Sequence, residues 1–426
     1  MYSEFIALEN GITSTQKRAF LENLIDSYDH RLNRVLIIPP DFTRFHSNAG
    51  ELAEILYNLL RNRCEITILP ALGTHAPLTH EEKSLMFGNI PKENFLTHDW
   101  RNDVVDLGII PSDFIEEISE QKLHYPIKVE INKHLKTNFD LIISIGQVVP
   151  HEVAGMANGN KNILVGVGGS DMINKSHFLG ACYGIERIMG RIPTPVRDLF
   201  DYVFEMFLED LPLIYVQTVM KSNTAGKIHM KGLFGGEKNV PFRKAAKLSQ
   251  KLNITFLDKP LEKVVVYLDP TEYKSTWVGN KAIYRTRMAL IDNGELIILA
   301  PGLNRLGEDK TIDRLIRKYG YGKTNEILNA VENNNDLREN LSAAAHLIHG
   351  SSEDRFKITY CTSNIIQEEI MKVNYLHKNL SETEDLYNPR ALIEGYNSLP
   401  TGEEIYFIQN PALGLWTTKK RFLKTM

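Results

Sequence analysis

The sequence predicts an α/β protein with two domains: a larger N-terminal domain built on a mainly parallel sheet, and a smaller C-terminal α/β domain. The first observation is length, because 426 residues exceed what one compact core usually supports. The second is composition, since 43% hydrophobic and 24% charged residues exclude disordered, collagen-like and coiled-coil chains. The third is that apolar runs of strand length alternate with segments of helical spacing.

In the N-terminal two thirds, the expected strands are nearly continuous apolar runs, which are typical of strands buried on both faces. They lie at 35–38, 66–69, 139–145 and 213–219. The expected helices lie at 51–61, 79–87, 193–209 and 242–252. The second of these helices opens with Thr79 followed by His-Glu-Glu, which resembles a helix N-cap.

Leu257-Asp258-Lys259-Pro260 interrupts this alternation and is the expected linker, which gives domains of residues 1–258 and 259–426. A return of the last residues, about 20 of them, to the first domain is left open. The second domain should contain strands at 263–268, 295–300, 358–361 and 404–408, a helix at 276–291 and several helices between 311 and 348. We expect the active site in the cleft between the domains, where ligand sites often lie.

Charge and cysteine content narrow the class of protein. With 49 Lys+Arg against 53 Asp+Glu, the net charge of −4 gives no reason to expect nucleic acid or an anionic membrane as a partner. The sequence contains neither a signal-peptide pattern at Met1 nor a run of about 20 apolar residues. Cys64, Cys182 and Cys361 form no CxxC pair, so we expect a reducing, cytoplasmic setting.

Polar motifs follow three of the expected strands. Asp41-Phe42-Thr43-Arg44 follows the first strand, His75 in a Gly-Thr-His turn follows the second, and His151 follows the strand at 139–145. Each alone is also compatible with an ordinary turn bonded to backbone. Because the carboxyl ends of parallel strands meet at one edge, we expect the motifs to converge. Arginine binds carboxylate or phosphate, and two histidines on opposite sides of a substrate could exchange protons in either direction, as a racemase requires.

Further candidates are weaker. Lys161 lies in a glycine-rich stretch that ends in Gly166-Val167-Gly168-Gly169, a weak phosphate-binding signal. Trp277, Val278 and Lys281 should share a helix face, where a lysine at the helix start is disfavoured by the macrodipole. His346 and His349 form HxxH without an evident third metal ligand, and residues 284–287 are expected to be a solvated helix face.

The order and spacing of these motifs resemble the lactate racemase family, the 2-hydroxyacid racemases and epimerases that depend on a nickel-pincer nucleotide. The similarity rests on DxTR, GTHxP, Pro-His, a lysine ten residues later and a histidine sixteen beyond that, and it covers most of the chain. The resemblance implies a covalent link between Lys161 and the cofactor, nickel pyridinium-3,5-bisthiocarboxylic acid mononucleotide. His177 would complete the nickel coordination, and His75 and His151 would transfer protons.

The resemblance further implies that Asp41, Phe42, Thr43 and Arg44 contact the cofactor, and that Arg44 also contacts the substrate. The remaining substrate contacts would come from three residues of the second domain: Trp277, Val278 and Lys281. The family commonly has Tyr-Gln at the first two of these positions, so we expect a 2-hydroxy acid other than lactate: a sugar acid, or an aromatic or branched hydroxy acid. Asn280 and Tyr284 are expected to bond hydroxyls of its tail.

The implied activity is inversion of C2 by reversible hydride transfer to the cofactor, through a 2-oxo acid intermediate. The expected partners are a small 2-hydroxy acid and the proteins that synthesise and insert the cofactor. Two alternatives remain open. A nicotinamide-dependent 2-hydroxyacid dehydrogenase is disfavoured because the sequence has no GxGxxG fingerprint with a following acidic residue. The other alternative is a non-catalytic nucleotide-binding protein.

Overall fold

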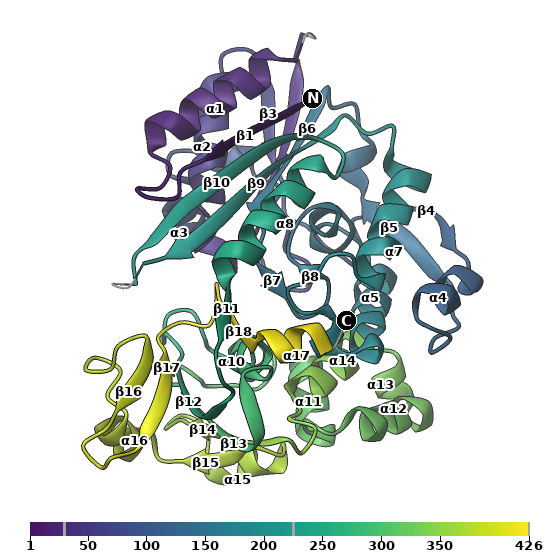
Figure 1. The fold of residues 1–426 in the computed structure, drawn as a ribbon. Helices are drawn as coiled ribbons and strands as arrows, with labels where there is room; N and C mark the ends of the chain where they lie inside the picture. The colour runs from purple at the N-terminus through teal and green to yellow at the C-terminus, as the bar shows by residue number, and fades with distance from the viewer. Residues whose placement is uncertain (29–30, 224–225, 425–426) are drawn as a thin grey trace. The chain divides into compact units, whose positions relative to one another are not determined.

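The structure, a computed structural model, describes residues 1–28, 31–223 and 226–424. The chain forms two compact units (Figure 1). Unit 1 comprises Met1–Ser176 and Arg191–Leu252, and unit 2 comprises His177–Gly190 and Asn253–Met426. The two units are described separately below. Within the described ranges, none of the helices is both long and apolar enough to span a bilayer.

Unit 1 is built on a six-stranded sheet in the order β1-β10-β9-β6-β2-β3. The four strands β9, β6, β2 and β3 are parallel, whereas β10 and β1 are antiparallel to their neighbours. The strand bounds are β1 Tyr2–Ile6, β2 Arg34–Ile38, β3 Glu65–Ile68, β6 Leu141–Gln147, β9 Leu213–Ser222 and β10 Ile228–Glu237. All four strands expected in this region therefore form one mainly parallel sheet, as predicted.

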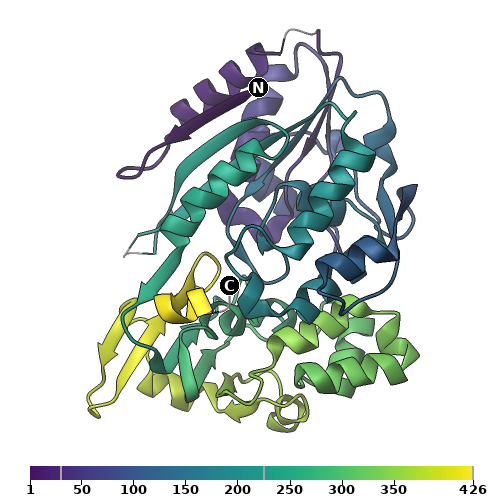
Figure 2. The ribbon, with the colours of Figure 1, turned by 45° about the vertical axis from the view of Figure 1, so that its right-hand side comes forward.

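Helices cover both faces of this sheet. On β10, Phe234 packs with Phe242 of α8, whereas its neighbour Gly235 faces Leu24 of α1. Because successive strand residues point to opposite faces, α1 and α8 lie on opposite sides of the sheet (Figure 2). The helix bounds in this part of the chain are α1 Ser14–Asp26, α2 Ala49–Leu60, α3 His80–Phe87, α4 Ser112–Ile118, α5 Ser170–Tyr183, α7 Pro195–Val203 and α8 Val240–Asn253.

Short elements complete unit 1. A 3-10 helix, η1, spans Phe42–Ser47, and a π-helical turn, η4, spans Asn162–Gly166. The expected helix 193–209 is α7 followed by a second π-helical turn, η5, at Phe204–Leu208. Two antiparallel strand pairs escaped prediction: β4 (Val104–Ile110) with β5 (Ile127–Asn132), which α4 connects, and the hairpin of β7 (Pro150–His151) with β8 (Gly155–Met156). The 3-10 helices η2 and η3 span Lys92–Asn94 and Lys133–Lys136.

Unit 2 contains a second six-stranded sheet in the order β15-β14-β13-β12-β17-β16, in which only the edge strand β16 is antiparallel. The strand bounds are β12 Leu261–Tyr267, β13 Leu290–Leu299, β14 Phe356–Cys361, β15 Leu376–Lys378, β16 Gly395–Ser398 and β17 Glu404–Ile408. A separate parallel pair joins β11 (Ile254–Leu257) to β18 (Leu415–Thr418). The helices are α6 Ile185–Ile188, α9 Thr276–Gly279, α10 Lys281–Thr286, α11 Lys310–Tyr319, α12 Thr324–Asn333, α13 Asn335–Arg338, α14 Leu341–Gly350, α15 Gln367–Lys372, α16 Leu380–Leu386 and α17 Lys419–Lys424.

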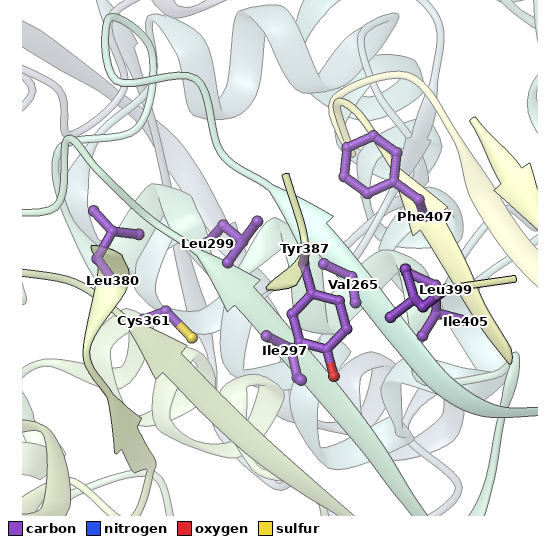
Figure 3. Close-up of a cluster of buried hydrophobic side chains, with 9 residues drawn as sticks. All are labelled: Val265, Ile297, Leu299, Cys361, Leu380, Tyr387, Leu399, Ile405 and Phe407. Carbon is purple, nitrogen blue, oxygen red and sulfur yellow. The ribbon is translucent and has the colours of Figure 1, made fainter. Parts of the chain in front are cut away.

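One face of this sheet carries an apolar core (Figure 3). Alternate strand residues such as Val265, Ile297 and Phe407 pack with Leu380 of α16 and with Tyr387. Cys361 lies within this cluster, and burial raises the pKa of its thiol to about 11. This cysteine is therefore a core residue with little thiolate at neutral pH.

Two expectations for the C-terminal part differ from the structure. The predicted helix 276–291 is two short helices, because the chain turns at Asn280 between α9 and α10, ends α10 at Thr286 and enters β13 at Leu290. The helix face at 284–287 is buried, not solvated. Its two arginines donate to backbone carbonyls: Arg285 to those of Ala412 and Gly414, and Arg287 to those of His349 and Ser351.

The division into units also shows to which unit several segments of the chain belong. The chain enters unit 2 at Asn253, so residues 257–260, the expected linker, join β11 to β12 inside that unit. The last described residues, including β18, belong to unit 2 as well. Residues 177–190 are part of unit 2 although they lie within the predicted N-terminal domain.

Candidate functional site

Three polar motifs of unit 1 follow adjacent strands. β2 lies between β3 and β6 in the sheet, and all three strands are parallel. Asp41 therefore follows the middle strand, while His75 and His151 follow its two neighbours. A bridge between Pro40 and Ala71 continues the β2–β3 pairing beyond the strands. This pairing holds the loops that carry Asp41 and His75 side by side.

Asp41 and His75 form a carboxylate–imidazole pair. Asp41 is buried directly before η1, and its Oδ2 contacts Nδ1 of His75. The Thr43 hydroxyl donates to the other carboxylate oxygen at 2.7 Å. Burial opposes ionisation of Asp41, but the charges of His75 and Arg44 and these hydrogen bonds lower its pKa below the usual value. Since the ionised carboxylate only accepts, Nδ1 of His75 carries a proton, and Nε2 of the neutral ring carries the lone pair of a base.

The segment that carries Lys161 is fastened to the same sheet edge. The side-chain amide of Asn162 donates to the Ile38 carbonyl of β2 at 3.2 Å and to Ser144 Oγ of β6 at 3.0 Å. The Gly73 N–H, in the His75 loop, donates to the Gly166 carbonyl at 2.9 Å. Lys161 immediately precedes the π-helical turn η4 that these bonds hold, and such turns are frequent at functional sites.

The environment of Lys161 favours the neutral amine. Desolvation lowers its pKa to about 8, assisted by the charges of Arg44 and Arg197 and opposed by those of Glu152 and Asp41. Among the residues that the structure describes, none accepts a hydrogen bond from the Lys161 amine or from the Arg44 guanidinium. Two neighbouring cations without hydrogen-bond acceptors, half-buried beside an acid–base pair, are suited to bind an anion.

His151 has the opposite tautomer to His75. It belongs to β7 and is buried. The backbone N–H groups of Val153 and Ala154 approach its Nδ1 at 3.1 and 3.4 Å. Because Nδ1 accepts, the neutral ring carries its proton on Nε2, from which Glu152 Oε1 lies 3.8 Å away. In this geometry His151 is a hydrogen-bond donor.

The two remaining residues of the DxTR motif support this edge. Phe42 begins η1 and packs against Phe45 with a centroid distance of 5.5 Å. Thr43 fixes the Asp41 carboxylate, as described above. The glycines at 166–169 do not form an open phosphate cradle, because the N–H groups of Val167 and Gly169 donate to the carbonyls of Asn162 and Glu130.

Two residues of this region were missed from the sequence. Gln147 ends β6 and is buried, and among the described residues its Nε2 has no hydrogen-bond acceptor. Arg197 of α7 holds the β7–β8 hairpin by donating to the carbonyls of Ala154 and Met156, and its charge contributes to the low pKa of Lys161. Nothing local marks either residue, but a buried donor without an acceptor is a common sign of an absent ligand.

A cavity of about 540 Å³ in unit 1 has the wrong charge for an anionic substrate. Its walls include Phe45 and His46 of η1, but also the carboxylates of Glu51 and Glu54. Those carboxylates would repel a hydroxy acid. The strand-end edge, which carries Arg44 and Lys161, is therefore the better candidate site.

The other predicted residues belong to unit 2. His177 is half-buried on α5, in the part of that helix that belongs to unit 2. Trp277, Val278 and Lys281 are also half-buried, and the Lys281 ammonium lies 5.7 Å from the ring centroid of Tyr273. Asn280 accepts from the Tyr360 hydroxyl at 2.8 Å, while its Nδ2 has no hydrogen-bond partner among the described residues, and Tyr284 bonds His346 at 2.8 Å. The expectation that these two residues bind substrate hydroxyls stays a prediction.

Comparison with known proteins agrees with these features. Residues 7–184 match the model of the lactate racemase N-terminal domain. This match covers less than half of the chain, and over that N-terminal part the chain is similar to lactate racemases. It is 30% identical over 149 residues to a lactate racemase of Thermoanaerobacterium thermosaccharolyticum. This match spans 34% of the chain and about a third, 32%, of the relative.

Two solved structures share the fold of this chain. A crystal structure of a Thermotoga maritima protein matches with a TM-score of 0.84 at 23% identity, over 97% of this chain and 100% of that one. The lactate racemase apoprotein from Thermoanaerobacterium thermosaccharolyticum matches with a TM-score of 0.69 at 18% identity, over 98% and 100% of the two chains. The predicted fold class, a mixed α/β chain with largely parallel sheets, is confirmed.

Proposed function

We propose that this protein is an isomerase that inverts C2 of a 2-hydroxycarboxylic acid. The observation that carries the proposal is the strand-end edge of unit 1. There, the Asp41–His75 pair supplies a base, Arg44 supplies a cation for the substrate carboxylate, and Lys161 supplies an amine for the cofactor; neither Arg44 nor Lys161 has a hydrogen-bond acceptor among the described residues. The match to the lactate racemase N-terminal domain, which includes these four residues, supports the same reaction class.

The substrate carboxylate would bind to arginine and lysine. Arg44 offers two parallel N–H donors, which suit a carboxylate and restrict its orientation. We propose Lys281 of unit 2 as a second cation for the same group. Holding the carboxylate would place C2 and its hydroxyl in a reactive position and would retain the planar 2-oxo acid while its C2 carbonyl turns to present the opposite face to the returning hydride.

Proton transfer at the hydroxyl oxygen would begin at His75. Its Nε2 takes the hydroxyl proton as the C2–H bond electrons leave as hydride, and the buried Asp41 stabilises the resulting imidazolium. His151 would donate a hydrogen bond from Nε2 to the substrate oxygen. For His151 itself to accept a proton at Nε2, its Nδ1 would have to lose the two backbone donors that it now binds.

The residues present fit an anionic cofactor that is linked through an amine. A lysine with a pKa near 8 is partly neutral at pH 7 and therefore nucleophilic, and the buried Gln147 Nε2 donor is suited to an anionic oxygen. We propose that Lys161 holds a nickel-pincer nucleotide covalently and that His177 ligates its nickel. When bound, this group supplies the hydride acceptor for C2. Lys161→Ala should remove the covalent adduct from the intact-mass spectrum, whereas the exposed-lysine variant Lys247→Ala should retain it.

The test of the reaction uses holoenzyme from the native host and enantiopure 2-hydroxy acids deuterated at C2. Chiral chromatography should show inversion, and mass spectrometry should show deuterium retained in the inverted product. Deuterium lost to solvent would contradict hydride transfer and indicate deprotonation at C2. Accumulation of 2-oxo acid only with added nicotinamide cofactor would instead establish a dehydrogenase.

A panel of 2-hydroxy acids, offered to the holoenzyme, separates lactate from acids with longer tails. Trp277 and Val278 are an aromatic and an aliphatic side chain beside Lys281, and they favour a tail with apolar area. We therefore expect a substrate other than plain lactate. The highest kcat/KM for lactate in this panel would contradict that expectation and leave the racemase proposal intact.

A further inference from the structure

The first histidine of the HxxH pair of unit 2 packs against Trp277. His346 lies on α14 and is buried. Its ring packs on the Trp277 indole with a centroid distance of 4.2 Å and an interplanar angle of 34°. Tyr284 and Tyr321 meet the same imidazole edge-on, at 6.3 and 5.4 Å. Aromatic rings therefore contact His346 from three directions.

A directed chain of hydrogen bonds fixes the imidazole. The Thr276 hydroxyl donates to the Leu306 carbonyl at 2.8 Å, so it accepts from the Tyr321 hydroxyl at 2.7 Å. The Tyr321 hydroxyl has then used its proton and accepts from His346 Nε2 at 3.1 Å. The Tyr284 hydroxyl accordingly donates to Nδ1 at 2.8 Å. The chain selects one tautomer and holds the plane of the ring.

The same chain holds the backbone of Trp277. Its N–H donates to the Leu306 carbonyl at 3.0 Å, the same acceptor that binds Thr276. Tyr321 stacks on Tyr375 at 4.5 Å, and Tyr360 bonds Asn280, the residue between α9 and α10. Both the main chain and the indole of Trp277 are thus tied to a buried polar and aromatic network.

This buried network is more extensive than the packing of one half-buried tryptophan alone requires. Tyr284, Tyr321, Tyr360 and His346 are all buried, and Trp277 is the half-buried ring that packs on His346. A rigid indole loses little conformational entropy when a ligand stacks on it, so preorganisation increases affinity for a flat tail.

We propose that His346 is a positioning residue that fixes the Trp277 indole as a wall for the substrate tail, and that this wall selects 2-hydroxy acids with an aromatic tail. The inference rests on the proposed function for the identity of the substrate. It assigns to His346 a role in specificity that acts through Trp277.

Two substitutions at His346 separate stacking from hydrogen bonding. His346→Phe keeps a ring against Trp277 and loses the bonds to both tyrosines, whereas His346→Asn keeps a polar side chain and loses the ring. The matched control is His349→Asn, a buried histidine on the same helix whose ring contacts Tyr284 at 5.9 Å.

The first readout is selectivity in holoenzyme, measured as the ratio of kcat/KM for 3-phenyllactate to that for lactate. His346→Asn should lower this ratio about 3- to 10-fold, through KM for phenyllactate, because one aromatic contact is lost. His346→Phe should preserve most of the ratio, and His349→Asn should leave it unchanged. An unchanged ratio in His346→Asn would overturn the inference.

The second readout needs no turnover. In a Trp100→Phe, Trp416→Phe background, Trp277 is the only remaining tryptophan, so its acrylamide quenching and anisotropy report on its mobility. His346→Asn should increase quenching about twofold or more and lower anisotropy, and 3-phenyllactate should perturb the signal more than lactate does. If no hydroxy acid is turned over but these changes appear, the proposed function fails and the role of His346 stands. If Trp277 responds neither to the substitution nor to the ligand, the inference itself is wrong.

Discussion

Lys161 should titrate far below an ordinary lysine in chain produced without the cofactor-inserting proteins. Burial, with the charges of Arg44 and Arg197, lowers its pKa to about 8. At pH 7 the neutral fraction is then about 9%, against about 0.03% for a lysine of pKa near 10.5, which is a difference of about 300-fold. Only the neutral amine attacks an electrophile, so this difference is the chemical basis for a selective covalent link at this position.

The measurement is competitive acetylation with isotope-coded acetic anhydride at a series of pH values, followed by mass spectrometry of the Lys161 peptide. Each lysine is normalised to its own plateau at high pH, so limited access to Lys161 changes the plateau and leaves the midpoint unaffected. The midpoint should lie near pH 8. Lys128 is an internal reference in the same sample, because its hydrogen bond and ion pair with Glu130 raise its pKa above the ordinary value.

Substitution of Arg44 tests the cause of the shift. Because the cation of Arg44 disfavours a second positive charge nearby, Arg44→Gln should move the Lys161 midpoint upward. The control Arg243→Gln removes an exposed cation that is not among the causes of the shift, and should leave the midpoint in place. A wild-type midpoint at or above about 10 would refute the burial argument and with it the assignment of Lys161 as a preactivated nucleophile.

Three other predictions concern single residues. His75→Gln and His75→Ala should each lose about 10²–10⁴ in turnover. His151→Gln should retain more turnover than His151→Ala, because its amide still donates; equal losses for both His151 variants would make that residue a proton carrier. His177→Ala should lower nickel content in holoenzyme, measured by metal analysis, while His75→Ala retains it; equal nickel loss in both would contradict the separate roles. Glu186 accepts hydrogen bonds from three arginines, so Glu186→Gln should destabilise unit 2 by about 3–5 kcal/mol at pH 7 in urea unfolding. Burial opposes ionisation of Glu186, but the arginines lower its pKa overall. The difference in unfolding free energy between wild type and Glu186→Gln should therefore shrink as pH falls below the unfolded carboxyl pKa of about 4.3. A free-energy difference that is independent of pH would contradict this account.

The parallel core of each unit could be predicted because continuous apolar runs identify strands that are buried on both faces. Val35–Ile38 and Val264–Val266 are fully buried central segments, and both were expected from residue type alone. β10 was missed because its sequence includes a lysine and three glycines, which weaken the strand pattern. The helix predicted through Asn280 failed for a different reason: a tertiary hydrogen bond from Tyr360 holds the turn, and periodicity carries no information about that partner.

The positions of the site residues were easier to predict than their chemical states. The alternation of strands and helices predicts parallel strands whose carboxyl ends share one edge, and the order β6-β2-β3 makes the loops of Asp41, His75 and His151 neighbours there. The roles of the two histidines do not follow from it. His75 meets a buried carboxylate at Nδ1 and becomes a base at Nε2, whereas His151 meets backbone N–H groups at Nδ1 and becomes a donor at Nε2.

This difference originates in local backbone geometry. The β7–β8 pairing brings His151 opposite Gly155, whose φ of +76° is a backbone conformation that L side chains rarely adopt. A Cβ at Gly155 would also lie 2.1 Å from the Arg191 carbonyl, so a side chain there would displace the turn that aims two N–H groups at the imidazole. A short glycine-dependent hairpin, which no residue periodicity marks, thus determines the tautomer of His151 and its chemistry.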